Sequence, residues 1–405
     1  MDLWKSEKWF VSPWNYFNKV TSQFSFPKDI KIHDLTLRDG EQQAGLVFNK
    51  DEKIEIAAKL AEVGVHRIEV GMPAVSPQDE AAIKQVVRMN LGPEIFCFSR
   101  CMIEDVKRAV DCGVDGIVIE IPSSEHIIEY AYNWPLQKAI DLSIEATKYA
   151  EEQGLYVVFF PIDATRAEMG WFLDLIEKVA TEGHMDALAL VDTLGVLSPH
   201  AVGYLIEKVK ERIDKPLETH FHNDFGLGTA NTLIALASGA EVAQTSVASI
   251  GERAGNASFE EVVLSLLTMY GIDVGIRYEK LRELSKLVIS KIPNYKVATN
   301  RPIIGDMIYK VESGIIADWV RRSRKEHPLE VFPFKWDFIG HKPPEIVLGK
   351  GSGRSSIVEW LEKIGAKVSD EDVGGLLLKV KERSMEKKGL LTQKEFEEIV
   401  AQSRH

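Results

Sequence analysis

The stretch Ile30-Lys31-Ile32-His33-Asp34-Leu35-Thr36-Leu37 is the first of eight short runs in which apolar and β-branched residues gather. The later runs lie at residues 66–70, 95–99, 116–121, 156–160, 187–191, 217–222 and 242–247. Runs of this length and composition predict β-strands, and an apolar period of about 3.6 residues in most of the gaps predicts helices between them. Between Lys50 and Ala61, for example, Ile54, Ala57 and Leu60 fall near one helix face.

Eight strand–helix units in succession have the size and order of a (β/α)₈ TIM barrel. A doubly wound open sheet is the alternative, but it usually has fewer strands, and the glycine-rich phosphate loop that follows its first strand is missing here. We therefore predict an α/β fold, a TIM barrel with a mostly helical C-terminal extension.

Three domains follow from the changes of pattern along the 405 residues. Residues 1–28, rich in Trp, Phe and Tyr, form an N-terminal arm, and residues 29–275 form the catalytic barrel with a metal site. Residues 276–405 form a C-terminal linker with helical subdomains that we expect to make a dimer. Within it, residues 349–354 predict a turn before a helix, and residues 370–402 predict a charged helical tail.

The composition restricts the class of protein. A net charge of -12 disfavours a nucleic-acid-binding surface, which needs clustered Lys and Arg. Three cysteines, an odd and sparse set, argue for a reducing compartment and for thiols that serve packing. No segment has the length and apolarity of a signal peptide or a membrane span. We expect a cytoplasmic protein without membrane or nucleic-acid partners.

Chemically capable side chains gather where the predicted strands end, which is where TIM barrels carry their active sites. His220 and His222, two positions apart on the seventh strand, point to the same face and enter the barrel mouth together. Asp39, which we place at the end of the first strand, and Asn256, after the eighth, can add a carboxylate and an amide oxygen. Such a set predicts a divalent metal site for Mg, Mn or Zn. The alternative is a pair of polar, hydrogen-bonded barrel histidines.

Arg38 stands next to the predicted metal ligand Asp39. A buried arginine needs an anionic partner, and an oxygen of the substrate is a natural one. In the structural alternative Arg38 simply pairs with Glu69 of the second strand.

Several spaced motifs in one order resemble those of the DRE-TIM metallolyase superfamily. They match the branch that contains 2-isopropylmalate, homocitrate, citramalate and Re-type citrate synthases. The similarity spans residues 30 to about 270, with weaker echoes to Arg354. The motifs are Asp34-Leu35-Thr36-Leu37-Arg38-Asp39-Gly40-Glu41-Gln42, Ile68-Glu69-Val70-Gly71-Met72-Pro73-Ala74, Asp192-Thr193-Leu194-Gly195, His220-Phe221-His222-Asn223-Asp224-Phe225-Gly226 and Gly251-Glu252-Arg253-Ala254-Gly255-Asn256.

The resemblance implies a homodimeric acyltransferase of amino-acid biosynthesis that is 2-isopropylmalate-synthase-like. It implies the condensation of acetyl-CoA, a 2-oxo acid and water to a 2-hydroxy dicarboxylic or tricarboxylic acid and CoA. The implied metal ligands are Asp39, His220, His222 and Asn256. The implied catalytic residues are Arg38, Glu69 and Thr193, and the implied substrate-binding residues are Gln42, Arg100 and Thr193.

The chain departs from the family pattern at two positions. Where the synthases have Glu-Ser-Gly-Ile-His, with a catalytic histidine, this chain has Ile316, and Gly351 replaces the histidine of Leu-Gly-Lys-His-Ser-Gly-Arg. Isoleucine cannot transfer a proton, so the base stays open among His126, Glu312 and His341.

The 2-oxo acid is open as well. No arginine lies in residues 123–130, where homocitrate synthases hold the distal carboxylate of 2-oxoglutarate. This absence favours an apolar acid such as 2-oxoisovalerate, while oxaloacetate fits if Arg100 or Arg166 pairs with it.

Three alternative functions are kept. The first is a Re-type citrate or homocitrate synthase. The second is retro-condensation as in HMG-CoA lyases, although those carry a cysteine in the loop where this chain has Ala254. The third is an inactive metal-binding paralogue, for which Ile316 is the motive.

Overall fold

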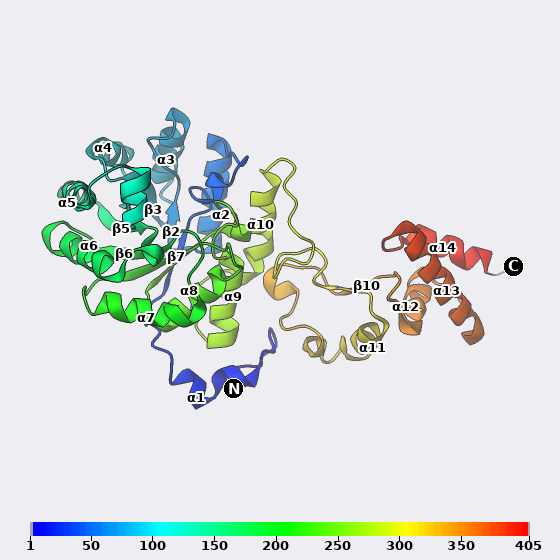
Figure 1. The fold of residues 1–405 in the computed structure, drawn as a ribbon. Helices are drawn as coiled ribbons and strands as arrows, with labels where there is room; N and C mark the ends of the chain where they lie inside the picture. Colours follow the sequence, from blue (N-terminus) through cyan, green and yellow to red (C-terminus); the bar gives the residue numbers. More distant parts are fainter. Residues whose placement is uncertain (1–2, 404–405) are drawn as a thin grey trace. The chain divides into compact units, whose positions relative to one another are not determined.

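The computed structural model describes residues 3–403 and consists of two compact units (Figure 1). One unit runs from Trp14 to Val297. The other joins the N-terminal segment that ends at Pro13 to the chain from Ala298 onward. The three-domain division at residues 28 and 275 stays a prediction.

The first unit is a closed barrel of eight parallel strands in sequential order, with the helices around it (Figure 1). The TIM-barrel prediction is confirmed. The strands are β1 (Lys31–Asp34), β2 (Arg67–Glu69), β3 (Glu94–Arg100), β4 (Gly116–Pro122), β5 (Tyr156–Ile162), β6 (Ala187–Asp192), β7 (Leu217–Phe221) and β8 (Val242–Thr245).

Helices follow the strands as the apolar period predicted. They are α2 (Lys50–Val63), α3 (Pro77–Met89), α4 (Ile103–Cys112), α5 (Leu136–Glu152), α6 (Met169–Glu182), α7 (Pro199–Lys210), α8 (Gly228–Ala237) and α9 (Phe259–Tyr270), then α10 (Leu281–Ser290). In α2, Asn49 and Glu52 form a capping box at the first turn, and Ala57 and Leu60 are buried on the inner face. The short α1 (Asn18–Thr21) precedes the barrel.

The first strand is shorter than predicted, which places two site residues on a turn. The Asp34 carboxylate accepts hydrogen bonds from the backbone N–H of Thr36, at 2.9 Å, and from its hydroxyl, at 3.1 Å. These local bonds compete with the strand ladder and end β1 at Asp34. We expected Arg38 and Asp39 to lie at the end of the first strand. In the structure they instead follow the strand, in a buried turn.

The second unit is mostly helical, as predicted. A small parallel sheet pairs β9 (Lys310–Val311) with β10 (Glu345–Ile346), beside helices α11 (Gly314–Ser323), α12 (Arg354–Ile364), α13 (Asp370–Lys387) and α14 (Gln393–Gln402). The turn at residues 349–354 leads into α12, and the predicted helical tail is two helices, α13 and α14. Trp360 and Phe396 pack in the core of this unit.

No helix within residues 3–403 is long and apolar enough to cross a membrane. The three cysteines, Cys97, Cys101 and Cys112, are buried free thiols.

Candidate functional site

Three ionisable side chains meet at the carboxyl-terminal mouth of the barrel. The Nε2 atoms of His220 and His222 lie 3.2 Å apart, and Asp39 Oδ2 lies 3.6 Å from the first and 3.9 Å from the second. All three residues are buried. His220 belongs to β7 and His222 follows it directly, so the alternation of strand side chains brings both imidazoles to one point.

Asn256 completes this cluster. Its backbone bridges to that of His222, and its Nδ2 donates to Asp39 Oδ1 at 2.8 Å. A Cβ at Gly251 would clash with the Asn256 amide and lie 2.9 Å from Asp39 Oδ1, so this position of the loop needs glycine. The structure thus brings together all four residues that the sequence analysis proposed as metal ligands.

The cluster has buried polar atoms that no described residue satisfies. Asn256 Oδ1 and His222 Nδ1 both lack a hydrogen-bond partner. Buried polar atoms without a partner are costly and rare in proteins. A carboxylate, two imidazoles and a free amide oxygen within this space have the chemistry of a divalent metal site, so these residues fit such an ion.

Gln244 sets the tautomer of His220. The Gln244 amide donates to Glu218 Oε2 at 2.8 Å, so its oxygen faces His220 Nδ1, at 2.9 Å. The His220 N–H at Nδ1 donates to that oxygen, and the Nε2 lone pair is left for the cluster. Burial lowers the pKa of His220 to about 3, which keeps the imidazole neutral, as metal ligation requires.

Glu218 anchors a charged layer beneath the cluster. It accepts from Arg67 Nη1 at 2.6 Å and lies 3.1 Å from His33 Nδ1, all inside the barrel. Burial alone would raise the pKa of Glu218, but His33 and Arg67 hold it below its usual value. The carboxylate that orients Gln244 therefore stays charged.

Arg38 is held against the cluster from the other side. Its Nε donates to Glu69 Oε1 at 2.7 Å, and its Nη1 donates to Asp39 Oδ2 at 2.8 Å and to Gln42 Oε1 at 3.2 Å. The guanidinium stacks 4.2 Å from the centre of the Phe98 ring. Burial would raise the pKa of Asp39, but Arg38 and the imidazoles hold it below its usual range. The ion pair between Arg38 and Glu69, which the structural alternative predicted, is present. It holds the guanidinium beside the proposed metal ligands.

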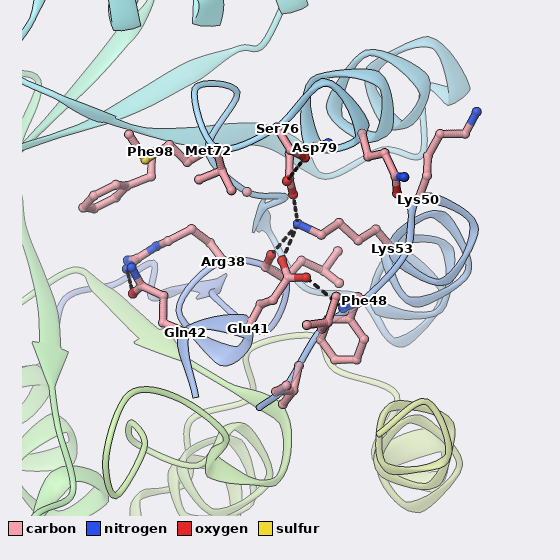
Figure 2. Close-up of a pocket in the computed structure, with 16 residues that line it drawn as sticks. Arg38, Glu41, Gln42, Phe48, Lys50, Lys53, Met72, Ser76, Asp79 and Phe98 are labelled. Carbon is pink, nitrogen blue, oxygen red and sulfur yellow. Dashed lines mark hydrogen bonds and ion pairs between the residues drawn. The ribbon is translucent and has the colours of Figure 1, made fainter. Parts of the chain in front are cut away.

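A cavity of about 410 Å³ opens beside Arg38 and Gln42 (Figure 2). Leu46, Phe48 and Val75 give it an apolar wall. A second wall holds the buried Lys53, whose Nζ pairs with Glu41 at 2.6 Å and Asp79 at 2.5 Å. The cavity therefore combines an apolar wall with a polar end at Arg38.

The other proposed substrate-binding residues occupy different places. Thr193 follows β6, and its hydroxyl accepts from the backbone N–H of Asp163 at 2.7 Å. Arg100 forms a two-point pair with Asp105, at 2.7 and 3.1 Å, and is not part of the metal cluster. Arg166 is tied to Asp163 in the same way, at 2.7 and 2.9 Å.

Of the three candidate bases, His126 alone lies in the barrel unit. Its Nε2 is 3.1 Å from Oδ2 of the buried Asp163. Glu312 and His341 belong to the second unit, where Glu312 accepts from the backbone N–H of Gly351 at 2.7 Å. Ile316 packs there against the apolar cluster of Val311, Ala317, Val320 and Ile346.

Sequence reasoning missed Gln244, Glu218 and the β4 residue Glu120. Each points into the barrel on a strand that was predicted. Counting alternate positions outward from the apolar interior residues would have placed them on the inner face.

Comparisons with known proteins agree on one family. Residues 29–288 match the model of a family described as HMGL-like. "Homocitrate synthase AksA" of Methanothermobacter thermautotrophicus is 36% identical over 393 residues, which cover 97% of each chain. The 2-isopropylmalate synthase of Methanocaldococcus jannaschii is 38% identical, over 87% of this chain and 67% of that protein. "(R)-citramalate synthase CimA" of the same organism is 36% identical, over 87% and 70%.

Among solved structures, the HMG-CoA lyase of Bacillus subtilis superposes with a TM-score of 0.62 at 21% identity. The match covers 69% of this chain and 98% of that one. At this identity the likeness shows the barrel fold.

Proposed function

The chain belongs to the HMGL-like family, and from this we propose that it condenses acetyl-CoA with a 2-oxo acid at a divalent metal in the barrel mouth. The relatives are named as synthases of three different 2-hydroxy acids, which supports the reaction class and leaves the acid open. The observation that carries the proposal is the convergence of Asp39, His220 and His222 beside Arg38.

The proposed metal ligands are Asp39, His220, His222 and Asn256, with Mg, Mn or Zn as the ion. When bound, the ion supplies a Lewis acid for the keto group of the 2-oxo acid.

Arg38 is proposed to stabilise the charge that develops on the keto oxygen. Its guanidinium is buried and fixed by Glu69 before the substrate arrives, so little reorganisation is needed during the reaction. Gln42 supports the same guanidinium. Thr193 is proposed to bind the substrate carboxylate, while Arg100 reaches a substrate only after leaving Asp105.

The thioester is proposed to enter through the cavity of about 410 Å³, because its polar end meets Arg38 (Figure 2). For the proton of the acyl methyl group we propose His126. The buried carboxylate of Asp163 orients its imidazole, as acid–base histidines need. A homodimer and a cytoplasmic location remain proposals, which light scattering and cell fractionation test.

The test is a thiol-release assay with acetyl-CoA, Mn²⁺ and a panel of 2-oxo acids. We expect release with at least one acid and none after chelation. Cleavage of a hydroxyacyl-CoA without thiol release from any acid would favour the lyase alternative. A bound metal without either reaction would favour the inactive paralogue.

A further inference from the structure

Glu120 is a carboxylate inside the barrel mouth that the reaction proposed above does not use. It follows Val118 by two positions on β4, and Val118 packs in the barrel interior, so Glu120 points to the same side. Its register partners are Arg100 on β3 and Phe160 on β5. Within the described residues, no side chain forms a hydrogen bond or an ion pair with its carboxylate.

The wall that carries Glu120 adjoins the metal cluster. Phe160, its neighbour across the sheet, packs its ring 4.7 Å from that of His220 and 5.5 Å from that of Phe98. Phe98 in turn lies under the Arg38 guanidinium. Neighbouring strands are about 4.8 Å apart. Glu120 therefore lies about that distance, backbone to backbone, from Phe160, whose ring contacts the proposed ligand His220.

A cavity of about 390 Å³ lies at Glu120 and Arg100. Of the two cations in its wall, Arg100 pairs with Asp105, and Lys138 is an exposed residue whose Nζ lies 4.4 Å from the centre of the Trp134 ring. Among the charged groups of this wall, Glu120 is the partly buried one, and its carboxylate is left to accept a hydrogen bond from a guest.

The rest of this wall is apolar and aromatic. Ile121 and Leu142 contribute aliphatic surface, and the Tyr132 and Trp134 rings pack 4.7 Å apart. A carboxylate among aromatic rings suits a cation or another hydrogen-bond donor at the end of an aliphatic chain. The Glu120 carboxylate repels a second carboxylate. A methyl group at the end of the guest cannot donate a hydrogen bond to it.

We propose that Glu120 selects the side chain of the 2-oxo acid by accepting a hydrogen bond from a donor at its far end. The donor is an ammonium, a guanidinium or a hydroxyl group. The inference rests on the proposed function and refines it: the sequence suggested an apolar acid, whereas this wall fits an apolar chain that ends in a donor. Acids that end in a carboxylate, such as oxaloacetate and 2-oxoglutarate, are rejected.

The experiment compares acids that differ only at the far end. One set is 2-oxobutanoate, 4-hydroxy-2-oxobutanoate and oxaloacetate, and the other is 2-oxohexanoate, 5-guanidino-2-oxopentanoate and 2-oxoadipate. For the wild type we expect kcat/KM to be highest for a donor-ended acid and lowest for the carboxylate-ended one. The variant Glu120→Gln keeps the size and removes the charge.

In Glu120→Gln, kcat/KM for the guanidino acid should fall about 10- to 100-fold, as for a lost hydrogen bond to a charged group. The value for 2-oxobutanoate should change less than about 3-fold, since that acid has no donor to lose. A large loss for the guanidino acid alone identifies a cationic side chain, and preference for the hydroxy acid with a smaller loss identifies a hydroxyl. Glu129→Gln, at an exposed glutamate on the same side of the barrel, is the matched control.

Two results would overturn the inference. An equal fall of kcat for every acid would make Glu120 the proton acceptor, and unchanged selectivity would leave it without this role. Calorimetric binding of the same acids to Mn²⁺-loaded protein separates the two proposals, because it reports selectivity without turnover. Selective binding without thiol release would contradict the condensation and keep the role of Glu120.

Discussion

The barrel mouth and the C-terminal unit both carry motifs of the synthase branch, but the two regions use them differently. In the mouth, Asp39, His220 and His222 converge with polar atoms left for a ligand. In the C-terminal unit, the corresponding motif ends in Ile316, whose apolar side chain packs against a hydrophobic cluster. The comparison agrees with our proposal that the mouth binds a metal, and it gives the segment that is the usual site of proton transfer a structural role in this chain.

The C-terminal motifs have a packing role that needs no histidine. A Cβ on Gly314 would lie 2.7 Å from the Gly353 Cα, so the two motif segments run in backbone contact. Glu312 adds a hydrogen bond to the backbone of Gly351. These contacts give the C-terminal motifs a packing role in this chain.

The largest effect on activity is expected from the substitution of a residue in the barrel mouth. Asp39→Ala should reduce thiol release to background, because it removes a proposed ligand and leaves the buried Arg38 without that partner. Turnover with metal added in excess is the measurement. Near-normal turnover would place the chemistry elsewhere, and an unchanged circular dichroism spectrum controls for folding.

His126→Asn tests whether proton transfer has moved to the mouth. We expect kcat to fall by about 10²- to 10⁴-fold, the usual contribution of a general base, with little change in metal affinity. His184→Asn, which removes another carboxylate-paired histidine, is the control. Equal kcat values for wild type and His126→Asn would contradict this assignment.

Gln244→Leu sharpens the account of how the mouth is held. Loss of the bond that sets the His220 tautomer should weaken Mn²⁺ binding by about 10- to 100-fold. At saturating metal, kcat should recover most of its value. Unchanged affinity would show that the tautomer needs no such support.

The pH dependence of stability follows from the buried imidazole. The pKa of His220 is about 3 in the folded protein and near 6.5, the ordinary value for histidine, in the unfolded chain. Between these two pH values the unfolded chain binds a proton at His220 and the folded chain does not. Stability of the metal-free protein should thus fall as pH drops from about 6.5 toward 3, by up to about 1.4 kcal/mol per unit. Urea unfolding at several pH values measures this, and His220→Gln should flatten the slope.

The smallest effect is expected at Ile316. Ile316→Val should cost about 0.5 to 1.5 kcal/mol in the unfolding of the C-terminal unit and leave kcat unchanged. Ile316→His, which restores the residue of the synthase pattern, should not raise kcat. A gain of 10-fold or more would mean that proton transfer still belongs to this segment.

The succession of strand and helix patterns, together with the missing phosphate loop of an open sheet, was enough to predict the barrel, because eight such units in a row have the size and order of this fold. The early end of β1 was not visible, since it depends on how the Asp34 side chain bonds to Thr36. The same local competition placed Arg38 and Asp39 on a turn.

The convergence of the mouth residues could be predicted because strand ends meet at one edge of a barrel. Their supports could not. Gln244 contacts His220 from 24 positions away, and the pair of Arg100 with Asp105 depends on side-chain rotamers. Whether the Glu120 carboxylate has a hydrogen-bond partner depends on the residues that surround it in the cavity, and the sequence of β4 does not show this.

The most direct test of the central claim is a Mn²⁺ titration of the metal-free protein followed by electron paramagnetic resonance. We predict one tight site per chain in the wild type and its loss in Asp39→Ala and His222→Ala. Binding of equal strength in all three proteins, or none in the wild type, would contradict a metal centre at this mouth.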